Sequence, residues 1–291
     1  MKHIIYPTLF LLCLQIVKAQ PGPIKNLRYE DDWSHLNNDT ALKKGTDKLK
    51  FIPISSSKKT HISFGGELRE WYEVRKNVNF GDVPPGYVAD NNGVLLHRFM
   101  IHTDLWLGDC IRFFGQLNNT FEIGSPTEPI PEINVDGLGI HQVFTELYLT
   151  QKKDTSSTFL RLGRQEFDFG NGLVISSREG PNNRQAFDGI SLVHKRTTHT
   201  HHFLAATPII INPGVFDNNH IEEYVWGVYN TFRRQKTFKL DAYYFGFNSK
   251  RGKYIFKSGA QTRHTFGGRW WAQTNKFKVD IESMYQIGKF N

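Results

Sequence analysis

The sequence predicts an all-β protein, an antiparallel up-and-down transmembrane β-barrel of which about eleven strands are present. Apolar and polar residues alternate with a period of two over most of the chain after Thr60, which indicates strands that face two different environments. Most of these strands exceed the roughly 5–6 residues common in soluble proteins. Their length suits a tilted crossing of the hydrocarbon layer, which takes about 9–11 residues.

The connections between the predicted strands give the third observation, because long and short ones alternate. The long connections are 76–94, 124–140, 168–186, 211–221 and 249–261, and the short ones are 108–110, 151–156, 196–199, 233–236 and 273–276. Outer-membrane barrels alternate in this way, with short turns in the periplasm and long loops outside. A soluble β-sandwich, which is the alternative for so aromatic a chain, has no reason to do so.

The N-terminal residues 1–19 are predicted to be a secretory signal peptide. Lys2 gives a positive start, residues 4–17 form an apolar run, and Ala19 is a suitable cleavage residue. A buried strand or helix at a soluble N-terminus is the alternative. After cleavage only Cys110 remains, so no intrachain disulfide is expected.

Residues 20–59 show weak periodicity, and we interpret them as a periplasmic N-terminal extension with at most a short helix near 33–44. The barrel domain follows over residues 60–291. In 95–107, for example, Phe99 and Ile101 share one face while Arg98 and His102 share the other. The predicted strands are 61–75, 95–107, 111–123, 143–149, 157–167, 187–195, 200–210, 222–232, 237–248, 262–272 and 277–287.

Three motifs lie close together in residues 161–189. They read Gly-Arg-Gln-Glu at 163–166, Arg-Glu-Gly-Pro-Asn-Asn-Arg at 178–184 and Phe-Asp-Gly at 187–189. This block resembles the alginate export family of outer-membrane channels. The segment Phe-Gly-Gly-Glu-Leu-Arg at 64–69 and the 95–107 strand are similar to the family's early strands, so the resemblance covers roughly residues 60–290. It implies a monomeric barrel of about eighteen strands with an arginine-lined pore for an anionic polysaccharide.

Eleven strands that start in the periplasm would leave Asn291 on the outer side. Single-chain bacterial barrels close with an even number of strands, and an open sheet edge cannot face lipid. We therefore expect a C-terminally truncated member of the family, a fragment that lacks about seven strands.

The face opposite the apolar one would line the lumen, and its charges balance at nine of each sign. The basic residues are Arg69, Arg75, Arg98, Arg112, Arg161, Lys239, Arg263, Arg269 and Lys278, and the acidic ones are Glu67, Glu73, Asp104, Glu122, Glu146, Glu223, Asp241, Asp280 and Glu282. This count does not by itself support anion selectivity. Pairs across neighbouring strands could simply stabilise the wall.

Selectivity would then need an uneven arrangement, and the long connection 168–186 is the best place for one. It carries Arg178 and Arg184, with Arg164 just before it, while Asp168, Glu179 and Asp188 could orient these guanidinium groups. A guanidinium offers a planar fork for the carboxylate of a uronate sugar. Our hypothesis is that the loop folds into the lumen as a basic constriction; the alternative is a loop held by internal ion pairs. The substrate-binding candidates are Arg69, Arg98, Arg112, Arg161, Arg164, Arg178, Arg184, Arg263 and Arg269.

No nucleophile elbow, P-loop, zincin motif or dinucleotide fingerprint is present in the sequence. We predict no enzyme activity, no cofactor, no metal site and no nucleic-acid binding; His199 and His201 could share a strand face but have no nearby carboxylate. The expected function is passive diffusion of an anionic, alginate-like polysaccharide or oligosaccharide through an outer-membrane channel surrounded by lipid. The alternatives are a general diffusion porin and, less favoured, an outer-membrane enzyme or a surface binding protein. Import and export are not distinguished.

Overall fold

The computed structural model of the 291-residue chain describes most of the part in which strands were predicted. The signal peptide predicted at 1–19 lies outside the described residues. The structure describes residues 24–37, 43, 45–76, 93–125, 130, 132–150, 156–213, 217–219, 221–234, 237–254 and 257–291.

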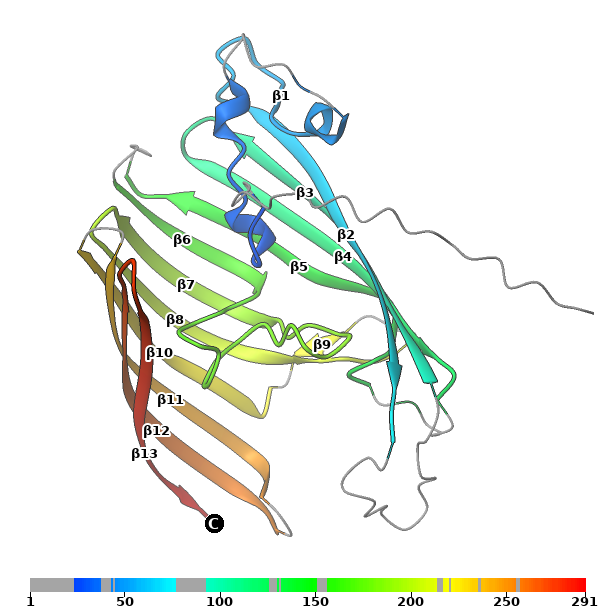
Figure 1. Ribbon diagram of the computed structural model, residues 1–291, viewed down its shortest axis with the longest axis vertical. Coiled ribbons are helices and arrows are strands. Elements are labelled where there is room, and N and C mark those ends of the chain that lie inside the picture. The colour runs from blue at the N-terminus through cyan, green and yellow to red at the C-terminus, as the bar shows by residue number, and fades with distance from the viewer. Residues whose placement is uncertain are drawn as a thin grey trace, which may run out of the picture.

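A single antiparallel sheet dominates the described residues, and its order along the sheet follows the chain (Figure 1). Eleven strands have ten residues or more, which confirms the predicted fold class. They are β2 (His61–Val74), β3 (Gly93–Leu107), β4 (Ile111–Ile123), β5 (Asp136–Tyr148), β6 (Ser156–Gln165), β7 (Phe187–Arg196), β8 (His199–Ile210), β10 (Glu223–Arg234), β11 (Phe238–Tyr254), β12 (Lys257–Gln273) and β13 (Lys278–Phe290). Two short strands, β1 (Ile52–Pro53) and β9 (Asn218–Asn219), pair with β2 and β8.

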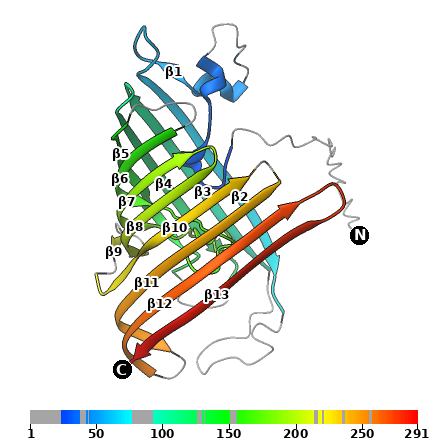
Figure 2. The ribbon, with the colours of Figure 1, turned by 90° about the vertical axis from the view of Figure 1, so that its left-hand side faces the viewer.

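The sheet curls strongly but does not close (Figures 1 and 2). β1 and β2 form one edge, and β13 forms the other, where it pairs with β12 alone among the described strands. The curl gives the sheet a concave inner face and a convex outer face.

Two strand boundaries differ from the sequence prediction. The predicted loop 249–261 is wrong, because β11 and β12 continue through most of it and only 255–256 separate them. Polar residues such as Asn248 and Gln261 suggested a loop, yet Asn248 still pairs with Thr262 and Ser249 with Gln261. β5 begins at Asp136 rather than near 143, because two register shifts in its pairing with β4, the first of which leaves His141 of β5 without a partner in the ladder, interrupt the alternation.

Burial separates the two faces of the sheet. On β3, Arg98 and Met100 point to the inner face and are 1% and 2% exposed, whereas Phe99 and Ile101 point outward and are 43% and 45% exposed. Large apolar side chains cover much of the outer face, as in a wall that meets lipid.

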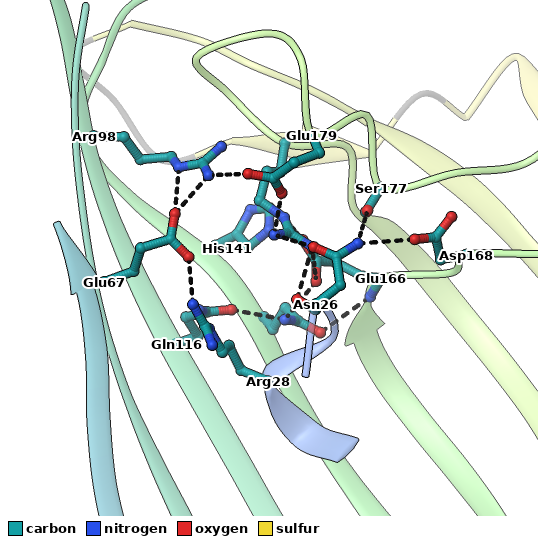
Figure 3. Close-up of polar contacts among 12 residues, drawn as sticks. Asn26, Arg28, Glu67, Arg98, Gln116, His141, Glu166, Asp168, Ser177 and Glu179 are labelled. Atoms are coloured by element: carbon teal, nitrogen blue, oxygen red, sulfur yellow. Dashed lines mark hydrogen bonds and ion pairs between the residues drawn. The ribbon is translucent and has the colours of Figure 1, made fainter. Parts of the chain in front are cut away.

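Two segments cover part of the inner face (Figures 1 and 3). One is the N-terminal segment 24–37 with the 3-10 helices η1 (Arg28–Glu30) and η2 (Ser34–Asn37), followed by η3 (Gly45–Leu49). The other is the loop 166–186 between β6 and β7. Phe167 and Ile175 of this loop join Leu204, Tyr229 and Phe245 of the sheet in a buried cluster. In the described part of the chain, no helix is long and apolar enough to cross a membrane.

Candidate functional site: the inner face and the loop 166–186

The loop 166–186 is fixed to the inner face by a side-chain amide. Asn182 is fully buried, and its Nδ2 lies 2.9, 3.2 and 3.0 Å from the backbone oxygens of His97, Phe121 and Asn134. Arg69 of β2 donates to the Glu179 and Pro181 oxygens at 2.9 and 3.0 Å. The loop therefore lies on the inner face across β2 to β4 and beside the start of β5; its role as a basic constriction stays a prediction.

Alternating charges connect this loop with the wall and with the N-terminal segment. Arg98 donates to Glu67 at 2.9 and 2.5 Å and also contacts Glu179. Arg28 donates to the other oxygen of Glu67 at 2.8 Å. Arg184 donates to Glu179 at 2.5 Å, so Glu179 bridges two arginines. The members are Arg28, Glu67, Arg98, Glu179, Arg184, Glu166 and His141 (Figure 3).

Glu166 is the most enclosed carboxylate of this series, with 1% of the residue exposed. Arg184 donates to both of its oxygens, at 2.5 and 3.1 Å, and His141 Nε2 lies 2.8 Å from Oε1. Burial alone would raise the pKa of the Glu166 carboxyl, but the hydrogen bonds and charges of His141 and Arg184 outweigh it and hold the pKa below its usual value. Glu166 therefore stays ionised.

A second buried group surrounds Glu146 on β5. This carboxylate accepts from Arg161 at 2.9 and 2.6 Å and from Arg112 at 3.2 Å. Arg112 also donates to Asp104 at 2.7 and 2.9 Å and to the Tyr29 backbone oxygen at 2.7 Å. Both arginines predicted here are therefore already paired.

The N-terminal segment accepts further hydrogen bonds from an arginine that the sequence suggested for cargo binding. Arg184 donates to the side-chain and backbone oxygens of Asn26 at 3.2 and 3.1 Å, and Asn26 donates to Asp168 at 2.9 Å. The Tyr29 hydroxyl donates to the Glu166 backbone oxygen at 2.9 Å, and burial raises its pKa, so it stays a neutral donor. Residues 24–37 thus pack on the inner face, although their weak periodicity suggested a tail.

The remaining inner-face candidates differ in how far they are neutralised. Arg269 forms two bonds of 2.7 Å with Asp280 and donates to the Gly170 oxygen of the loop at 2.7 Å. Arg263 lies over the Phe247 ring at 4.8 Å and has no carboxylate partner among the described residues. Arg178 is exposed, has a positive φ of 53°, and has no ion-pair or hydrogen-bond partner in the described part of the chain.

Arg164 and Asp188 lie on the opposite, outer face of the sheet. They form bonds of 2.9 and 3.2 Å with each other, and Arg164 also donates to the Ile140 and Asp217 backbone oxygens at 3.0 and 3.2 Å. They are not part of the inner-face group; the role of Arg164 in substrate binding and that of Asp188 in orienting guanidinium groups stay predictions.

Sequence reasoning overlooked five members of this site: Asn26, Arg28, Tyr29, His141 and Glu166. Glu166 belongs to the Gly-Arg-Gln-Glu motif, so its motif was a usable signal. His141 lies beside the register shift that disturbs β5. Asn26 and Tyr29 lie in a segment without periodicity, where no local signal indicates a contact with residues more than a hundred positions away.

The geometry separates structural arginines from available ones. Arg98, Arg112, Arg161 and Arg184 are buried and paired, and removal of one partner from such pairs leaves an uncompensated charge. Arg178 and Arg263 keep guanidinium donors for an anion. The described residues contain no group of three or more His, Cys, Asp or Glu side chains arranged to hold a metal ion.

A scan against protein-family models matches residues 60–291 to the family described as alginate export. The chain belongs to the alginate export family. At the level of this family it is an outer-membrane polysaccharide export channel, and the family is one of transport channels rather than enzymes. Searches of curated proteins and of solved structures found no match.

Family membership gives the two faces their environments. Outer-membrane barrels carry an outward apolar band and a polar interior, and the apolar outer face and polar inner face of this sheet fit that pattern. The short turns of such barrels lie on the periplasmic side, and the turns at 108–110 and 197–198 are of this short kind.

Proposed function

We propose that the chain passes an anionic, alginate-like polysaccharide or oligosaccharide by passive diffusion, through a pore that is partly lined by arginine and formed by one chain surrounded by lipid. The observation that carries the proposal is the exposed Arg178, which has no ion-pair or hydrogen-bond partner among the described residues, on a loop that lies across the inner face. The paired charges around it hold the loop in place, so the free guanidinium is presented at a fixed position.

A uronate carboxylate suits such a group. Arginine binds carboxylates through two parallel N–H donors, which favours a planar anion over a hydrated chloride. Arg263 offers a second free guanidinium on the same face of the sheet. Successive uronate units could therefore exchange between a few cationic positions without tight binding, as diffusion along a polymer requires.

A general diffusion porin is the second candidate, and the ion pairs of the inner face favour it. Glu67, Glu146 and Glu166 neutralise four of the nine arginines that the sequence suggested for cargo binding. A wall so balanced selects weakly between ions of opposite sign.

Planar-bilayer recordings of the full chain distinguish the two. We expect the variant R178Q/R263Q to lower the anion-to-cation permeability ratio and to raise the half-blocking concentration of an oligouronate about five-fold, or about 1 kcal/mol. The matched control R196Q removes an exposed arginine from the outer face and should change neither quantity. If oligouronate blocks the variant as well as the parent, the free guanidinium groups do not bind cargo and the porin function is favoured.

A further inference from the structure

Three histidines gather on the outer face, near the turn 197–198 that joins β7 to β8. His194 lies on β7, and His199 and His201 lie on β8. Their ring centroids are 5.6 Å apart for His194 and His199, 4.9 Å for His199 and His201, and 6.1 Å for His194 and His201. We call these three residues the outward histidine cluster.

The side-chain partners fix the direction of each ring. The Nδ1 atoms lie 2.8 Å from Thr158 Oγ1 for His194, 3.1 Å from Thr198 Oγ1 for His199 and 2.7 Å from Asn230 Oδ1 for His201. Each Nε2 is left for another partner. The rings lie side by side at interplanar angles between 13° and 44°. Among the described residues, neither these histidines nor any other group of His, Cys, Asp and Glu side chains is arranged to hold a metal ion.

The charges around the cluster are all basic. Those that act on His199 come from His194, His201, Arg196 and Arg233. Arg196 at the end of β7 and Arg234 at the end of β10 are exposed, and each lies two residues after an outward residue of its own strand, His194 and Phe232, so they also point outward. No described carboxylate balances this surface, in contrast with the inner face, where nearly every arginine has one.

The apolar side chains of the same strands set the depth of the cluster in the wall. Outward Ile190 and Leu192 on β7, Phe203 on β8 and Phe232 on β10 are 43%, 36%, 48% and 44% exposed. Ile190, Leu192 and Phe203 lie farther from the turn 197–198 than the histidines and the two arginines do, whereas Phe232 pairs with His199 and lies at the level of the cluster. In a membrane barrel this is the level at which acyl chains give way to headgroups.

We propose that the outward histidine cluster, with Arg196 and Arg234, binds the phosphate of an anionic phospholipid in the leaflet on the short-turn side of the sheet. The proposal rests on the outer face meeting lipid and does not depend on the cargo. Two guanidinium groups hold the phosphate oxygens, and the free Nε2 atoms complete the site. A protonated imidazole carries a positive charge that the neutral ring lacks, so we expect binding to be stronger at about pH 6 than at about pH 8.

The experiment counts phosphatidylglycerol and phosphatidylcholine molecules that stay bound to the full chain in native mass spectrometry, at the two pH values. The parent should prefer phosphatidylglycerol, more so at the lower pH. We expect H194Q/H199Q/H201Q to bind phosphatidylglycerol about tenfold more weakly at about pH 6 and to lose the pH dependence. Glutamine keeps the polar contacts to Thr158 and Asn230.

Two variants keep the result interpretable. H97Q is the matched control, since His97 also faces outward but pairs with Glu70 at 2.5 Å and stacks on Phe121 at the other end of the sheet; it should behave like the parent. R196Q/R234Q leaves the histidines in place and should also weaken phosphatidylglycerol binding. It replaces the triple variant as the test if that variant fails to fold. The proposal is overturned if phosphatidylglycerol has no advantage over phosphatidylcholine, or if the variants bind phosphatidylglycerol like the parent. It is also overturned if inorganic phosphate binds the site with equal affinity and abolishes the preference for phosphatidylglycerol. Loss of binding in EDTA would overturn it too, because a metal ion would then hold the lipid.

Discussion

The guanidinium carbon of Arg161 lies 4.0 Å from the centre of the Tyr29 ring. Tyr29 belongs to the N-terminal segment and Arg161 to β6, so this contact joins two parts of the chain that are far apart in sequence. Phe114 and Phe144 meet the same ring edge-on at 6.2 and 5.5 Å. The segment 24–37 is thus held against the wall by an aromatic anchor in addition to its hydrogen bonds.

Tyr29 should therefore control how firmly the N-terminal segment occupies the inner face. We expect Y29A to lower the free energy of unfolding by about 3–5 kcal/mol, the range for a buried aromatic side chain, and to raise single-channel conductance because the segment is released. Urea unfolding in detergent and bilayer recordings measure the two effects. Y29F loses only the hydroxyl bond to the Glu166 oxygen, so its loss should be about 0.5–1.5 kcal/mol. Unchanged conductance in Y29A would mean that the segment does not narrow the pore.

Arg184 and Arg178 lie six residues apart in one loop, but substitution of Arg184 should lower stability far more than substitution of Arg178. R184M leaves the buried Glu166 without its guanidinium partner, and we expect a loss of about 3–5 kcal/mol together with faster proteolysis of the loop. R178M removes an exposed, unpaired side chain and should stay within about 0.5 kcal/mol of the parent.

A double variant tests whether the cause is the uncompensated charge. R184M/E166Q removes both members of the pair, so its loss should be smaller than the sum of the two single losses. Additive losses would show that the two side chains do not act together.

The period of two determined how much could be predicted. Strands such as β3 were recognised because one face is apolar and the other polar. The burial of adjacent residues on β3 follows this pattern, since Arg98 is 1% exposed and Phe99 is 43% exposed. The ends of β11 and β12 were missed because polar residues that extend a strand beyond the apolar band look like a loop. Ion pairs within the wall and the loop were weighed as alternatives, but the contacts with the N-terminal segment were not predicted, because Arg28 and Glu67, or Asn26 and Arg184, meet only after the sheet has curled.

Gly163 shows a requirement of the β5–β6 pairing that the alternation does not indicate. Its φ is +125°, a conformation that other residues rarely adopt, and an added Cβ would lie 2.3 Å from the Val143 backbone oxygen. We expect G163A to lower the free energy of unfolding by more than the roughly 1–3 kcal/mol of backbone strain alone, so that most molecules do not fold. The heat-dependent shift in gel mobility of folded barrels measures the folded fraction. G115A in β4 is the control, because an added Cβ there meets nothing within 4 Å. Equal folding yields for the two variants would contradict this reading of Gly163.

The Glu166 carboxylate should make stability depend on pH in acid. Its pKa is lower in the folded chain than the value of about 4.3 in an unfolded one, so the unfolded state binds more protons as the pH falls. The stabilisation is fully present above about pH 5 and is lost as the pH drops through the folded-state pKa, with a slope of at most about 1.4 kcal/mol per pH unit. E166Q should be less stable than the parent at neutral pH, and the gap between them should shrink between about pH 5 and pH 3. Other carboxylates of the inner face contribute a slope of their own, so the quantity to measure is the difference between the two urea-unfolding curves. Parallel curves would show that Glu166 titrates alike in both states, and that His141 and Arg184 do not stabilise its charge.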